Sequence, residues 1–173
     1  MEPPAKFKTV LNLKTAKALR LTVPPMLLAT VDFERQSLAD GLKAAGFQAD
    51  RPAFFQWLGV VPYLTRDAVS ATLDFIAQVP ESEVVFDYAE PFANYTTERR
   101  ANVMAVAATA AALGEPWLSL FDPGELSEML RHKGFGIVED LGMAEITDRF
   151  YGALKQSIVI GLGGHVVRAR KTR

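Results

Sequence analysis

The sequence predicts an open α/β sheet that is mostly parallel and gains an antiparallel strand at its end. Apolar stretches of strand length alternate with segments of helical periodicity, which is the pattern of an α/β domain. Two of these stretches, FFQWLGVV and EVVFDY, are dominated by apolar residues, as strands buried on both faces of a parallel sheet are. Near the end, the Gly-rich turn GLGG separates two short strand-like segments and predicts a hairpin.

The first part of the chain is predicted to hold a helix, a short strand and a second helix. Lys14–Arg20 is rich in helix formers, and the proline pair that follows stops the helix. A short apolar strand ends at Asp32 and Phe33. Ser37–Ala45 has two leucines on one helical face, and Gly46 follows it as a C-terminal stop.

The middle of the chain repeats a strand followed by a helix. Phe54–Val61 is predicted to be a strand, and Arg66–Val79 has apolar residues at helical spacing. Thr65 precedes that helix as a favourable N-cap. Glu83–Tyr88 is the next predicted strand, and the Ala-rich Thr97–Leu113 is the next helix.

The last part of the chain begins with a strong helix signal. Asp122 is a favourable N-cap, followed by a proline at the first helical position, and the helix runs to Lys133. The elements predicted after it are a strand at Phe135–Glu139, a helix at Ala144–Tyr151, and the two hairpin strands Ser157–Ile160 and His165–Arg170.

Composition restricts the class of protein. The chain has 173 residues, of which 49% are hydrophobic and 23% charged, enough for one globular domain with a buried core. The net charge of -1 does not indicate binding to nucleic acid or to an anionic membrane. The absence of cysteine excludes disulfides and Cys-based metal sites. No apolar run approaches the ~20 residues of a membrane helix, and MEPPAKFK lacks the apolar core of a secretory signal, so we expect a cytoplasmic protein.

Six residues are predicted at the carboxyl ends of strands, where ligands bind in open α/β sheets. They are Asp32, Phe33, Tyr63, Asp87, Tyr88 and Glu90. The Asp32 carboxylate can accept the exocyclic amine of an adenine, while Phe33 packs on the ring. The alternative, that Asp32 caps a helix beginning near Glu34, is the commoner role for such a residue.

Asp87, Tyr88 and Glu90 form a second candidate group. A buried strand that ends in two carboxylates and a phenol can hold a substrate or supply an acid-base group. The alternative is a hydrogen-bonded entry into the loop before Pro91. From the residues alone this alternative is the commoner outcome, and no catalytic residue can be assigned.

Other features indicate structural roles. GLGG is not a phosphate cradle, because the strand-like HVVRAR follows it where a cradle needs the N-terminus of a helix. Trp57 is more typical of a core residue than of a cofactor wall. His132 and His165 are isolated in the sequence, and no metal site can be assembled around them.

Several motifs occur together between Val31 and the end of the chain: VDF, RPAFFQWLGVVPYLT, RDAVSATLDFIA, SEVVFDY, LGEPW and FDPGELSEMLRHKGFGIVEDLG. Together they resemble the S-adenosylmethionine-dependent methyltransferases of the leucine carboxyl methyltransferase type. The resemblance covers 31–173 and implies a Rossmann-like class I methyltransferase fold. It also implies S-adenosylmethionine as cofactor and methyl transfer to an oxygen of a small-molecule or carboxylate acceptor.

The resemblance implies a role for each candidate residue. Asp32 and Phe33 would end the third strand and contact the adenine. The segment Trp57–Tyr63 would face the methionine end of the cofactor. The acceptor-side candidates are Tyr63, Asp87, Tyr88 and Glu90. Phe33 and Pro62 stand where the family usually has Leu and Met.

The resemblance also places a glycine-rich cofactor loop and a ribose-binding acid before Asp32. The first 31 residues contain no glycine. We therefore expect a sheet without its first two strands and impaired cofactor binding. We also expect an exposed apolar edge on the strand at 54–61, through which the chain associates with itself. The alternative function is that of a non-catalytic remnant that acts only through protein–protein association.

Residues 2–29 resemble a different family. The run NLKTAKAL followed by LTVPP is similar to the C-terminal end of ABC-transporter substrate-binding proteins. This resemblance predicts a helical leader of unrelated origin over 1–30, and the C-terminal part of a methyltransferase-like domain over 31–173.

Overall fold

The computed structural model describes residues 38–44, 46–152 and 164–172. Three predicted elements lie outside these residues: the helix Lys14–Arg20, the strand that ends at Asp32 and Phe33, and the strand Ser157–Ile160. The helices are α2 (Leu38–Ala44), η2 (Val61–Tyr63), α3 (Arg66–Gln78), η3 (Phe92–Asn94), α4 (Thr97–Ala112), α5 (Pro123–His132) and α6 (Met143–Phe150), where η marks a 3-10 helix. Among these described helices, none has the length and apolar character needed to span a bilayer.

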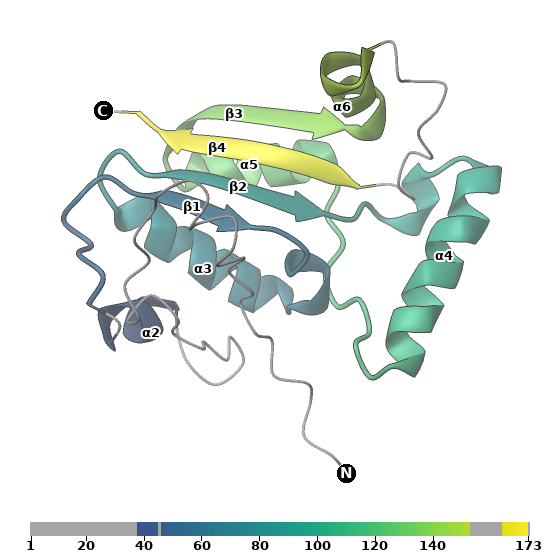
Figure 1. The fold of residues 1–173 in the computed structure, drawn as a ribbon, viewed down its shortest axis with the longest axis horizontal. Coiled ribbons are helices and arrows are strands. Elements are labelled where there is room, and N and C mark those ends of the chain that lie inside the picture. The colour runs from purple at the N-terminus through teal and green to yellow at the C-terminus, as the bar shows by residue number, and fades with distance from the viewer. Residues whose placement is uncertain (1–37, 45, 153–163, 173) are drawn as a thin grey trace, which may run out of the picture.

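The strands of the described residues form one mixed sheet in the order β1-β2-β4-β3 (Figure 1). They are β1 (Phe54–Trp57), β2 (Glu83–Tyr88), β3 (Phe135–Gly142) and β4 (His165–Lys171). β1 and β2 are parallel, whereas β4 is antiparallel to both of its neighbours. β3 therefore runs in the same direction as β1 and β2, with the last strand inserted between β2 and β3. The predicted α/β class with an antiparallel last strand is confirmed.

Two strands end three or more residues away from the predicted end. β1 ends at Trp57 rather than Val61, because Gly59 adopts a φ of +72°, a left-handed conformation that a strand does not continue through. β3 continues to Gly142 rather than ending at Glu139, because its pairing with β4 extends that far. Tertiary pairing and turn geometry set these ends, and neither is visible in a hydrophobic pattern.

The predicted helix caps are present. The Thr65 hydroxyl accepts a hydrogen bond from the Ala68 N–H at 3.2 Å at the start of α3. The Asp122 carboxylate accepts from the N–H groups of Gly124 at 2.9 Å and Glu125 at 3.3 Å at the start of α5. These bonds satisfy backbone donors that have no partner within the helix.

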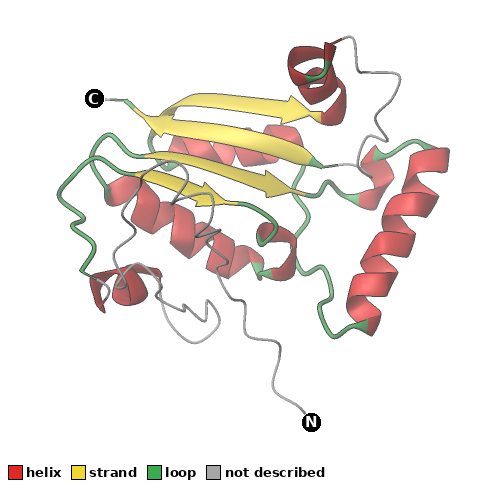
Figure 2. Cartoon of the chain, in the orientation of Figure 1, coloured by secondary structure: helices red, strands yellow, loops and turns green. Residues whose placement is uncertain are grey.

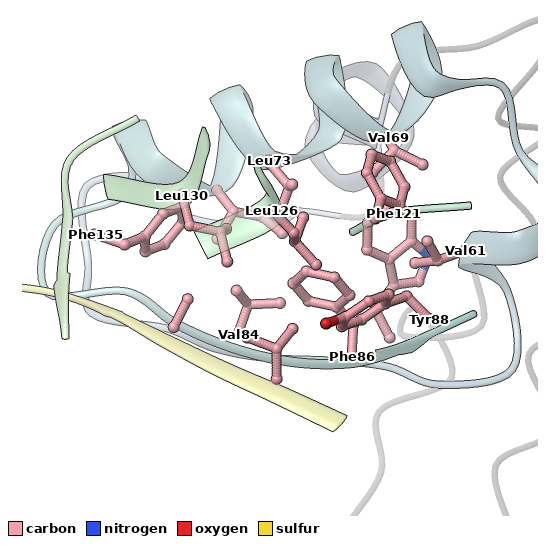
Figure 3. Packing of buried hydrophobic residues seen from close by; sticks show 14 of the residues in the cluster. Val61, Val69, Leu73, Val84, Phe86, Tyr88, Phe121, Leu126, Leu130 and Phe135 are labelled. Atoms are coloured by element: carbon pink, nitrogen blue, oxygen red, sulfur yellow. The ribbon is translucent and has the colours of Figure 1, made fainter. Parts of the chain in front are cut away.

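The hydrophobic core lies between one face of the sheet and the helices α3 and α5, which cover that face in Figure 2. Figure 3 shows apolar side chains of β2, α3 and α5 pointing toward one another. Aromatic rings run through this layer, with centroids 5.9 Å apart for Trp57 and Phe86 and 6.4 Å apart for Tyr88 and Phe121. The predicted core role of Trp57 is confirmed.

The opposite face of the sheet is partly exposed and carries charged side chains, which corrects one prediction. β2 alternates between buried and half-buried residues, and Phe54 of β1 is 63% exposed, so burial of these strands on both faces is wrong. Arg168 of β4 pairs on this face with Glu83 at 2.7 Å and with Glu139 at 3.8 Å. Only the register of β4 shows that charged side chains line this face, because they come from strands far apart in the sequence.

Candidate functional site

The candidate site lies where the carboxyl ends of β1 and β2 meet the first residue of β4. The parallel pairing of β1 with β2 brings the loops that follow them to the same edge of the sheet. The antiparallel pairing of β2 with β4 then sets His165 opposite Tyr88. Residues distant in the sequence are thereby collected at one edge.

The segment 118–121, before α5, ties the two loops together. The Leu118 N–H donates to the Pro62 carbonyl at 2.7 Å, and the Phe121 N–H donates to the Ala89 carbonyl at 3.0 Å. The Ser119 hydroxyl donates to the carbonyl of residue 61 at 2.7 Å. These bonds fix η2, which carries Tyr63, against the end of β2.

Asp87 holds the loop after β1. Its Oδ1 accepts a hydrogen bond from the Gly59 N–H at 2.5 Å. Asp87 lies on the side of β2 opposite to Tyr88, because successive side chains of a strand alternate between faces. A Cβ atom built on Gly59 would meet nothing within 4 Å, so open space lies beside this backbone.

Tyr88 and Glu90 belong to a hydrogen-bonded network with Asp140 and His165. The Tyr88 hydroxyl donates to Asp140 Oδ2 at 2.6 Å. His165 Nδ1 lies 2.8 Å from Asp140 Oδ1, and its Nε2 lies 3.2 Å from Glu90 Oε1. The side chains of Asp140, Glu90 and His165 are between 13% and 19% exposed, so the network is mostly shielded from solvent.

The network controls the protonation of two of its members. The hydrogen bond to Asp140 is the largest cause that raises the pKa of His165; burial opposes it and the charge of Glu90 adds to it. The pKa of Tyr88 is raised, first by burial and then by the bond to Asp140. Tyr88 is therefore a neutral hydrogen-bond donor, and His165 favours its charged form.

Glu90 is also held from its other side. Asn94 Nδ2 donates to Glu90 Oε2 at 3.2 Å and to Asp122 Oδ2 at 3.1 Å. The backbone N–H of Glu90 donates to the Tyr95 hydroxyl at 3.1 Å. The hydrogen bonds therefore run from β3 through His165 and Glu90 to the N-cap of α5.

The structure groups the predicted residues differently from their sequence order. Tyr88 and Glu90 come together, while Asp87 contacts the loop after β1 and Tyr63 lies in η2. The prediction of an adenine contact at Asp32 and Phe33 lies outside the described residues, and it stays a prediction.

Two residues of the network were not among the candidates. Asp140 and His165 become neighbours of Tyr88 only through the pairing of β2 and β3 with β4. The available signal was a histidine at the start of a predicted strand. The described residues hold no group of three or more acidic or His side chains arranged to hold a metal ion.

Comparison with known proteins supports the predicted family resemblance. The family model described as leucine carboxyl methyltransferase matches residues 6–77. A Bacillus subtilis (strain 168) protein described as "Putative S-adenosyl-L-methionine-dependent methyltransferase YktD" is 32% identical over 160 residues, which are 90% of this chain. The chain is therefore similar to the leucine carboxyl methyltransferases over residues 6–77 and to this methyltransferase over most of its length. This confirms the predicted resemblance. The chain spans about half the length of this curated relative, 52%.

Solved methyltransferase structures show looser likenesses to this chain. Magnesium protoporphyrin IX methyltransferase (ChlM) from Synechocystis PCC 6803, with bound SAH, is 12% identical with a TM-score of 0.49, covering 92% of this chain and 57% of that one. Haemonchus contortus phosphoethanolamine N-methyltransferase 2, in complex with S-adenosyl-L-methionine, is 10% identical with a TM-score of 0.41, covering 70% and 33%. Both TM-scores lie below 0.5, so neither likeness indicates the reaction of this chain.

The family match also crosses the predicted boundary between leader and domain. It begins at residue 6, within the segment that resembles a substrate-binding protein. Residues 1–37 lie outside the described part of the chain, so the division at 30 and 31 stays a prediction.

Proposed function

We propose that this chain carries the acceptor side of an S-adenosylmethionine-dependent methyltransferase site, with methyl transfer to an oxygen of a small-molecule or carboxylate acceptor. One observation carries the proposal. The open backbone at Gly59 and the polar network around Glu90 lie at the same edge of the sheet, after neighbouring parallel strands.

The described residues fit the methionine end of the cofactor. When bound, S-adenosylmethionine supplies a methyl group on a positively charged sulfur. The space beside Gly59 lets a ligand atom approach the backbone, and the nearby Asp87 carboxylate suits a ligand of positive charge. Asp32 and Phe33 are the proposed adenine contacts by resemblance.

The contribution of the chain's own residues to the reaction is binding and orientation. Tyr63, Asp87 and Glu90 are the proposed acceptor-side residues, and the buried Tyr88 donates a hydrogen bond that holds Asp140 in place. Glu90 accepts a hydrogen bond from a hydroxyl of the acceptor. Holding the reacting oxygen in line with the methyl group provides most of the rate enhancement in such a site.

We further propose that this chain alone binds the cofactor weakly. The first 31 residues contain no glycine, whereas the family resemblance expects a glycine-rich cofactor loop before Asp32. At millimolar S-adenosylmethionine, we expect changes in amide NMR shifts mainly at residues 58–63 and 87–90. The expected dissociation constant is about 1 mM, which corresponds to a binding free energy of about -4 kcal/mol.

A matched variant and two contrary outcomes make this titration decisive. Gly59→Asn keeps a residue that tolerates positive φ but fills the open space, so we expect it to reduce the amide shifts. Isothermal titration that gives low-micromolar affinity would contradict the impaired site. Saturating ligand without shifts at these amides would contradict its location.

We also propose that the outer edge of β1 pairs with a second copy of the chain. β1 is the terminal strand of the sheet in the described residues, and its Phe54 is largely exposed. An uncovered edge strand presents backbone donors and acceptors to other strands.

Light scattering after size-exclusion chromatography tests this association. We expect a dimer, and we expect Phe54→Lys to convert it to a monomer, because a charge at an edge opposes strand pairing. Phe150→Lys is the control, since Phe150 is equally exposed but lies in α6. A monomer at every concentration would reject the proposal.

A further inference from the structure

His165 lies between two carboxylates, and its protonation state decides whether it can donate a hydrogen bond to both. Its Nδ1 faces Asp140 at 2.8 Å and its Nε2 faces Glu90 at 3.2 Å. A neutral imidazole has one N–H donor, whereas an imidazolium has two. Both hydrogen bonds therefore exist together only while the ring is charged.

The proton toward Glu90 is the one that leaves first. Asp140 is the closer partner and the more buried carboxylate, 13% exposed, so it retains the Nδ1–H. When the ring becomes neutral, the lone pair of Nε2 faces Glu90 Oε1, and two acceptors repel each other. Among the described residues, Asn94 is then the side-chain donor that remains to Glu90.

We propose that His165 is a positioning residue of the acceptor site, which holds the Glu90 carboxylate in one orientation while the ring is protonated and releases it on deprotonation. The functional meaning of this device rests on the proposed role of Glu90 toward the acceptor. The device itself involves neither cofactor nor acceptor, so it can be tested without them.

The groups around the ring favour the charged form. Asp140 comes from β3, Tyr88 from β2, and Glu90 from the loop after β2. Glu145 of α6 approaches the same point, because a Cβ atom on Gly142 would meet both its Oε2 at 2.9 Å and the His165 ring at 3.4 Å. Asp122 lies one step further, beyond Asn94.

The Trp117 indole can report a change in the orientation of Glu90. Glu90 leads through Pro91 into η3, whose Phe92 ring stacks on Trp117 with centroids 6.3 Å apart and an interplanar angle of 20°. A change in the orientation of Glu90 therefore changes the surroundings of the Trp117 indole. The only other histidine is His132, in the last turn of α5, so two imidazole signals have to be assigned.

The experiment is a pH titration of the cofactor-free chain by NMR, following the His165 Cε1–H and the Trp117 indole N–H. We expect the two signals to change with the same midpoint. In Glu90→Gln, the His165 midpoint should move to lower pH and the Trp117 response should be lost. In Asp140→Asn, both midpoints should move to lower pH together.

Two results would overturn the inference. One is a Trp117 signal that does not follow His165, and the other is a His165 midpoint that Glu90→Gln leaves unchanged. If Asp140→Asn does not fold, the partly exposed Glu90→Gln still decides. Failure to bind S-adenosylmethionine would reject the proposed function without affecting this result.

Discussion

Replacing Phe86 by alanine is expected to lower the free energy of unfolding by about 3–5 kcal/mol. Phe86 is 0% exposed in the centre of β2, and its ring lies between those of Trp57 and Tyr88, with centroids 5.9 and 6.5 Å away. The truncation removes buried apolar surface and leaves a cavity that rigid neighbours cannot fill. Urea unfolding followed by circular dichroism measures the loss.

Phe150→Ala is the matched control for this prediction. The same side chain is removed, but Phe150 is 66% exposed on α6 and rests against Arg149. We expect a change of less than about 1 kcal/mol. Equal losses for both variants would show that the layer between the sheet and α3 and α5 is not the core of the fold.

The stability of the chain is expected to fall as pH rises through the pKa of His165. The pKa of His165 is raised in the folded state, mainly by the bond to Asp140. Below the unfolded-state value of about 6.5, both states bind the proton and the contribution is fully present. Above it, only the folded state retains the proton, so stability decreases until the folded pKa is passed. The two charge-assisted hydrogen bonds, offset by the cost of burying the ring, are expected to add about 2 kcal/mol to the free energy of unfolding.

The measurement is the difference between the unfolding free energies of the native chain and His165→Asn at a series of pH values. Asparagine keeps a neutral donor toward Asp140 but carries no charge, so the difference isolates the protonated ring. We expect the difference to shrink with rising pH. A difference that is constant across this range contradicts the charged state assigned to His165.

Local signals in the sequence predicted much of the fold. Periodicity located α3, alanine content located α4, and the Asp-Pro start located α5. Thr65 and Asp122 were identified as caps because capping depends on residues three positions apart at most. The apolar stretches located β1 and β2, which do pair in parallel, although their predicted burial on both faces was wrong. The family resemblance was visible in short motifs.

The site was predictable only in part. Tyr88 and Glu90 were identified because a polar pair follows a buried strand, a signal that is local. The partners that determine their chemistry, Asp140 and His165, are 52 and 75 positions away in their respective hydrogen bonds. No local pattern marks them, because neither residue is unusual at the end of a strand.

The sequence by itself determined which segments become helices and strands, because propensity, capping and periodicity act over a few residues. Only the tertiary structure decided that β4 enters between β2 and β3. That placement brings Arg168 beside Glu83 and Glu139 on one face of the sheet, and it sets the imidazole of His165 between two carboxylates. Strand order and register depend on backbone pairing between distant segments, and the charge of the site follows from that pairing.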